Sequence, residues 1–207
     1  LKENQLDLAV EQVNLLLARP KPSKESYNLG GLVAVRQQKT DLARQRFQNA
    51  LDLDPGYTRA VINFARIELF YNFDQEAIIR GLNRLQPLFS RQDEWGLESL
   101  RLLTEWAVLH PSYIRSTEGN LSEQLRHHPL AKIGDQCLAS EWELKRLTDP
   151  KKKEAVIEKL IASAAQLSAS DQRELAAWIN RQGLYQKTLK IFPLVPNAPD
   201  ALLLVQL

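Results

Sequence analysis

The chain has 207 residues, a formal net charge of +2 and a hydrophobic fraction of 44%, values that are typical of globular proteins. It contains no run of about 18 apolar residues, so we expect no insertion of this segment into a membrane. The small net charge gives no indication of a nucleic-acid partner. Its one cysteine, Cys137, cannot form an internal disulfide, and the composition is compatible with a cytoplasmic or a periplasmic location.

Three alanines recur at a spacing of 34 residues, Ala9, Ala43 and Ala77. Each lies in a segment whose apolar residues follow the spacing of one helix face. A period of about 34 residues is the length of one helix–turn–helix repeat. Because one such unit buries too little apolar surface to be stable alone, we expect neighbouring units to stack.

The clearest repeat has small, aromatic and proline residues at characteristic positions: Tyr27, Gly31, Ala43, Phe47, Ala50 and Pro55. This set resembles the tetratricopeptide (TPR) repeat, although Gly30 and Ala34 stand where the family has leucine and tyrosine. The small residues allow two helices to approach closely, and the aromatic rings fill the space between them. The resemblance implies an all-α fold, a right-handed α-solenoid of antiparallel helix pairs.

The same register extends to both sides of this repeat. Residues 2–18 are expected to form the second helix of a preceding repeat. The clearest repeats are expected over about residues 24–57 and 58–91. In the latter, Val61, Ala65 and Ala77 hold the register, whereas Gly81 replaces the large aromatic residue.

Beyond Leu88 the strict period ends, and degenerate helical repeats are expected over about residues 92–197. The segment 111–129 is expected to be irregular, and a further helix is expected to begin at 198–207. We therefore expect one TPR-like solenoid fragment over residues 1–207, with both ends cut from something larger. Apolar spacing in the degenerate part predicts helices over residues 95–109, 130–147, 151–167, 171–181 and 185–192.

Capping residues mark several of these helix starts. Asp149 precedes Pro150, which is favoured at the first helical position. Further starts are predicted at Asp74, at Ser90 with Asp93, and at Ser170 with Asp171. A tight turn between helices is expected at Gly183.

No residue pattern indicates catalysis, a metal or a cofactor. His127 and His128 are adjacent, so on a helix they diverge by about 100° and do not converge on one ion; a solvated helix end is the better interpretation. Cys137 is expected to be buried and inert. The three lysines 151–153 are interpreted as a solvated turn. Phosphate-binding glycine loops and nucleophile motifs are absent, and the tryptophans are expected in the core.

The family resemblance implies that the first helix of each repeat lines a concave groove. On this sequence, the groove would include Asn28 and Arg36 from one repeat and Arg59, Asn63 and Arg66 from the next. The last three residues share one helix face, because they lie at i, i+4 and i+7. Their amide and guanidinium donors suit the carbonyls or carboxylates of a peptide, so we expect an acidic ligand. The alternative is a solvated helix face without a ligand.

We therefore expect a scaffold, not an enzyme, that binds a protein or a peptide. Two alternatives remain open, an accessory or regulatory helical module of a larger enzyme and a structural, self-assembling segment. A homo-oligomer could form through the C-terminal apolar run, which includes Leu202, Leu203 and Leu207.

Overall fold

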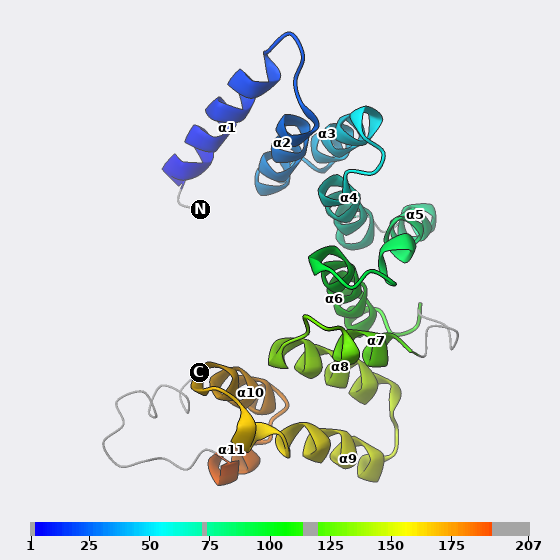
Figure 1. Ribbon diagram of the computed structural model, residues 1–207, viewed down its shortest axis with the longest axis vertical. Coiled ribbons are helices and arrows are strands. Elements are labelled where there is room, and N and C mark those ends of the chain that lie inside the picture. Colours follow the sequence, from blue (N-terminus) through cyan, green and yellow to red (C-terminus); the bar gives the residue numbers. More distant parts are fainter. Residues whose placement is uncertain (1–2, 72–73, 114–119, 192–207) are drawn as a thin grey trace. The chain divides into compact units, whose positions relative to one another are not determined.

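The computed structural model describes residues 3–71, 74–113 and 120–191, and these residues form an all-helical structure (Figure 1). The described ranges contain eleven α-helices and no strand. The prediction of an all-α fold is therefore confirmed. The chain divides into two compact units, Leu1–Trp106 and Ala107–Leu207, and each is described separately below.

The helices of the first unit, in chain order, are α1 (Glu3–Leu17), α2 (Lys24–Arg36), α3 (Thr40–Leu53), α4 (Thr58–Phe70), α5 (Gln75–Leu85) with the 3₁₀ turn η1 (Gln86–Leu88), and α6 (Glu94–Leu109) up to Trp106. The main contacts join α1 to α2, α2 to α3, α3 to α4, and α4 to α5. Helices α2 and α4 also touch each other. The helix predicted over residues 95–109 is thus confirmed as α6.

A close approach between α2 and α3 forms the centre of the first unit. Gly31 on α2 lies against the ring of Phe47 on α3, where a Cβ atom would come within 2.6 Å of Phe47 Cδ1. Ala43, one of the alanines of the 34-residue period, is fully buried beside this contact. Gly31 therefore acts as the space into which the Phe47 ring fits, as the sequence predicted.

The contact between α4 and α5 has the opposite arrangement. Here the glycine, Gly81, is on the second helix, and a Cβ atom on it would lie 3.0 Å from Leu69 Cγ and 3.2 Å from Glu68 Cβ. Leu69 and Glu68 belong to the first helix and are buried. In this helix pair the large residues are therefore on the first helix and the glycine is on the second, the reverse of the α2–α3 contact.

The turns after α2 and α10 have the same hydrogen-bond pattern. After α2, the Lys39 N–H donates to the carbonyl of Ala34; after α10, the Leu184 N–H donates to that of Ile179. Both turns place one residue in the left-handed region, Gln38 at φ 61° and Gly183 at φ 76°. This is the Schellman arrangement, which ends a helix and reverses the chain.

The helices of the second unit are α7 (Leu121–His127), α8 (Ile133–Arg146), α9 (Pro150–Ile161) with the 3₁₀ turn η3 (Ala164–Gln166), α10 (Ala169–Arg181) and α11 (Tyr185–Ile191). Helix α8 packs against α7, α9 and α10, and α11 packs against α10. Trp142 and Trp178 are buried in this unit, and Trp106 is buried on α6. Three of the four tryptophans are therefore core residues, as expected, whereas Trp95 is half-buried.

Three predicted boundaries require correction. The segment 111–129, expected to be irregular, contains α7, which buries Leu121 and Leu125 one helical turn apart. The helix expected over 151–167 ends at Ile161, and a separate 3₁₀ turn follows it. Helix α10 is capped by Ser168, whose hydroxyl accepts from the Asp171 N–H at 3.3 Å, so the start is not at Ser170.

Other predicted caps are confirmed. The Asp149 carboxylate accepts from the Lys151 N–H at 2.9 Å before a helix with proline at its first position. Asp74 caps α5 in the same way. At the start of α6 the cap is Asp93, whose Oδ1 accepts from the N–H groups of Trp95 and Gly96 at 3.1 Å each. The further helix predicted at 198–207 lies outside the described residues.

Candidate functional site

Two of the five predicted site residues form a bridge between α2 and α4. The side-chain amide of Asn63 donates from Nδ2 to the Asn28 Oδ1 at 2.9 Å. Asn28 is buried, with 7% of its surface exposed, and Asn63 is half-buried. The bond leaves the Nδ2 donors of Asn28 and the Oδ1 acceptor of Asn63 available for other partners.

A third predicted residue connects α4 to α6. The Arg66 guanidinium lies 2.8 Å from the Glu98 carboxylate and 3.8 Å from that of Glu105. All three side chains are partly exposed, so each ion pair contributes little to the free energy of folding. The pairing does, however, place two negative charges beside the guanidinium that was expected to attract an acidic ligand.

Glu105 is partly desolvated at this position. Burial raises the pKa of the Glu105 carboxyl above its ordinary value, and the nearby Arg66 guanidinium lowers it. The net pKa shift is upward, so burial outweighs the attraction of the arginine. The proximity of Arg66 therefore compensates only partly for the burial of this carboxylate.

Arg59 and Arg36 have different surroundings. The Arg59 guanidinium lies over the ring of Trp95 on α6, 5.5 Å from the ring centroid, in a cation–π contact. Arg36 ends α2 and is exposed, and the described residues show no hydrogen bond or ion pair between it and the other four predicted residues. Leu29 and Leu32 are exposed on the same helix. Arg36 and Arg59 are thus the more accessible cations.

We call these residues of α2, α4 and α6 the interhelical strip: Asn28, Arg36, Arg59, Asn63, Arg66, Trp95, Glu98 and Glu105. The three members on α6 were not predicted from the sequence. A signal for one of them was present, because Asn28, Asn63 and Glu98 are separated by 35 residues each time. This spacing of 35 residues could therefore have linked α6 to α2 and α4, although the strict 34-residue period ends at Leu88.

The other side chains that the sequence singled out are a cysteine, two adjacent histidines and three lysines, and each has its own surroundings. Cys137 is buried with 3% exposure, so its predicted burial is confirmed, and burial raises the pKa of its thiol to about 12. His127 is exposed, but His128 is buried, which corrects the expectation of a fully solvated pair. His128 Nδ1 accepts from the Leu130 N–H at 3.2 Å. Lys151, Lys152 and Lys153 are exposed in the first turn of α9.

In the part of the chain that the structure describes, His, Cys, Asp and Glu side chains do not come together in threes that could hold a metal ion. None of the described helices has the length and apolar character needed to cross a membrane. Comparison of the chain with family models, curated proteins and solved structures finds no significant match.

Proposed function

We propose that the chain is a scaffold that binds a peptide segment of another protein along the interhelical strip. In this proposal, the helix pairs α2–α3 and α4–α5 are successive repeats of a right-handed, TPR-like α-solenoid. Helices α2, α4 and α6 then line its concave face. The observation that carries the proposal is the alignment of these three helices through the Asn28–Asn63 bond and the Arg66–Glu98 ion pair.

The polar groups of the strip suit an extended peptide. The carboxamides of Asn28 and Asn63 together retain donors and an acceptor, which are the groups that a peptide main chain requires. Arg59 over Trp95 provides a cation on an aromatic surface, and the exposed Leu32 provides apolar contact. Such a mixture of rigid aromatic and adaptable polar groups is common at protein interfaces.

The charges of the strip refine the expected ligand. The strip contains three arginines and two glutamates. Both glutamates, Glu98 and Glu105, lie beside Arg66. We therefore assign the attraction of an acidic peptide to Arg36 and Arg59, and not to Arg66, whose guanidinium already has Glu98 and Glu105 beside it. A lost charge-assisted hydrogen bond to a ligand costs about 1.5–3 kcal/mol.

Affinity capture with charge-reversal variants tests this proposal. The immobilised chain is compared with the double variant Arg36→Glu/Arg59→Glu and with a matched control, Arg19→Glu/Arg173→Glu. The control changes the charge equally at two exposed positions outside the strip. We expect partners that bind the wild type and the control but are lost from the strip variant. If partners are retained equally by all three proteins, or if none binds the wild type, the proposal is wrong.

A further inference from the structure

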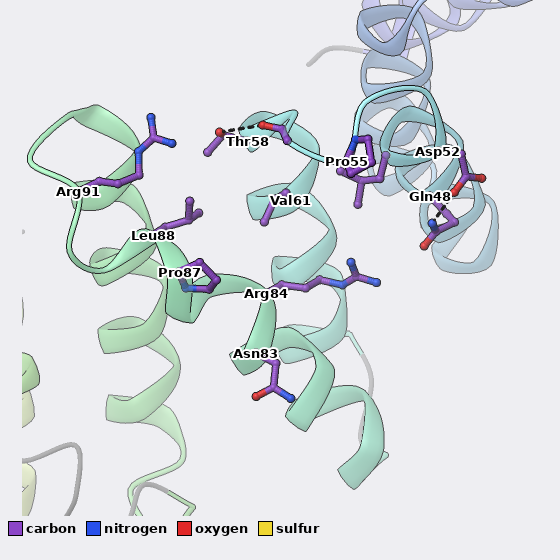
Figure 2. Close-up of a pocket in the computed structure, with 12 residues that line it drawn as sticks. Gln48, Asp52, Pro55, Thr58, Val61, Asn83, Arg84, Pro87, Leu88 and Arg91 are labelled. Carbon is purple, nitrogen blue, oxygen red and sulfur yellow. Dashed lines mark hydrogen bonds between the residues drawn. The ribbon is translucent and has the colours of Figure 1, made fainter.

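A hollow in the surface of the first unit lies between α3 and α5, outside the interhelical strip. It is a pocket of about 840 Å³ where the turn after α3 meets α4 and η1. Figure 2 shows Gln48, Asp52 and Pro55 on one side, Pro87, Leu88 and Arg91 on the other, and Val61 between them. All of its lining residues belong to the first unit, and none belongs to the strip.

The inner surface of the pocket is apolar. Leu51 and Leu88 are buried, Val61 is half-buried, and two prolines without N–H groups stand at the edges. Aliphatic side chains bind such surfaces because contact removes apolar area from water. The volume falls within the range of about 300–1,000 Å³ that is usual for ligand pockets.

The Arg84 guanidinium, which lines the pocket, is held in a fixed orientation by two contacts. Arg84 Nε donates to the buried carboxylate of Glu68 at 3.0 Å, and its guanidinium lies over the Phe64 ring at 4.1 Å from the centroid. Arg80 also binds Glu68, at 3.1 Å, so one carboxylate is shared by two guanidinium groups. Among the described residues, no acceptor is hydrogen-bonded to the terminal nitrogens of Arg84. These nitrogens can bind a carboxylate at little entropic cost, because the side chain is already ordered.

The remaining polar groups of the pocket are compatible with a peptide main chain. Gln48 and Asn83 are exposed carboxamides, which can pair with main-chain N–H and C=O groups. Asp52 accepts from Gln48 at 2.7 Å on the side of the pocket formed by α3, whereas Arg84 comes from α5. Arg91 donates to Asp93 from Nε and from a terminal nitrogen, whereas Arg84 donates to Glu68 from Nε alone, so Arg84 is the better partner for a ligand.

We propose that this pocket binds an extended segment of a partner protein in which an aliphatic side chain is followed by an acidic one. The aliphatic side chain fills the space over Leu51, Val61 and Leu88. The carboxylate pairs with Arg84, and the peptide main chain bonds to Gln48 and Asn83. This site is independent of the interhelical strip, so the chain has two surfaces for partner segments.

Peptide selection tests the proposal directly. A phage library of random dodecapeptides is selected on the immobilised wild-type chain. Each selected peptide is then measured by calorimetry against Asn83→Trp, which fills the pocket from an exposed position, and against Gln75→Trp, a matched control on the same helix outside the lining. We expect a class of peptides that loses at least tenfold in affinity for Asn83→Trp only. In that class, changing the acidic residue to its amide should also cost about tenfold.

Nitrogen-15 NMR of the wild-type chain provides a readout that does not depend on the folding of a variant. Addition of the selected peptide should shift the amide signals of Thr58, Val61 and Leu88. The proposal is overturned if no selected peptide depends on the pocket, or if the amide peptide binds as tightly as the acid. It is also overturned if 4-methylpentanoate alone binds as tightly as the peptide, which would make this a small-molecule site. Peptides lost only from the strip variant Arg36→Glu/Arg59→Glu would support the proposed function and exclude this second site.

Discussion

Gly31 and Phe47 are 16 positions apart in the sequence, and the missing side chain of one makes room for the ring of the other. The Phe47 ring is fully buried, so it has no free direction in which to move. By contrast, the neighbouring Gly30 faces the flexible end of Leu17, and a Cβ atom there would lie 3.1 Å from Leu17 Cδ1. An added Cβ atom is therefore expected to disturb the packing more at Gly31 than at Gly30.

Replacing Gly31 with alanine should destabilise the first unit by about 1–3 kcal/mol, because overpacking outweighs the gain of about 1 kcal/mol in helix propensity. Gly30→Ala is the matched control and should change the free energy of unfolding by less than about 1 kcal/mol. Chemical denaturation monitored by circular dichroism measures both. The double variant Gly31→Ala/Phe47→Leu should recover part of the loss. Equal stability of the two single variants would contradict this account of the contact.

Replacing Gln38 with glycine should stabilise the protein by about 0.5–1 kcal/mol, because Gln38 adopts a left-handed conformation that glycine adopts without steric cost. The corresponding change in the second unit, Gly183→Ala, should have the opposite sign and a cost of about 1 kcal/mol. Thermal unfolding of both variants provides the comparison. A destabilising Gln38→Gly variant would show that the Gln38 side chain makes contacts that outweigh its backbone conformation.

Removing both arginines that bind Glu68 should be strongly destabilising. Glu68 is 1% exposed, so the variant Arg80→Ala/Arg84→Ala leaves a buried carboxylate without a cation, at a cost of about 3–5 kcal/mol. Adding Glu68→Met to this variant should recover more than half of the loss, because it removes the buried charge. Arg19→Ala, at an exposed position of the same unit, is the control and should have little effect. If the triple variant is no more stable than the double variant, the charge of Glu68 is not the cause.

Cys137 should be unreactive in the native protein. Burial raises its pKa to about 12, so the thiolate that attacks a disulfide reagent is scarce at pH 8. The reaction with 5,5′-dithiobis(2-nitrobenzoate) should be about a hundred-fold slower than in denaturant. Since the folded pKa is above the unfolded one, the stability due to the neutral thiol should be lost as the pH rises towards 12. Fast labelling of the native chain would indicate that the core around α8 opens readily.

The contact between α2 and α3 could be predicted from the sequence, because packing there depends on residue size. Ala43, Phe47 and Gly31 are recognisable because a close helix contact permits few other residues. Five of the eight residues of the interhelical strip were named from the sequence. The three on α6 were not, since an ion pair such as Arg66–Glu98 joins residues 32 positions apart and leaves no local pattern. Helix α7 was missed because seven residues give too few apolar positions to establish a period.

The pocket between α3 and α5 could not have been predicted from the sequence. Its lining comes from three helices, two turns and a loop, and no two of its polar residues form a motif along the chain. The orientation of Arg84 depends on Glu68 in a preceding helix and on the Phe64 ring. Such a site results from the assembly of the helices and becomes visible only when they are packed together.

The opposite placement of the glycine in the two helix pairs restricts how such a chain can diversify. A single change of Gly81 to phenylalanine would drive a ring into Leu69 and Glu68. Recombination that joined α4 to α3, or α2 to α5, would bring two large residues or two glycines together. The helix pair is therefore the smallest segment that can be duplicated or exchanged, and its two contact positions must change together.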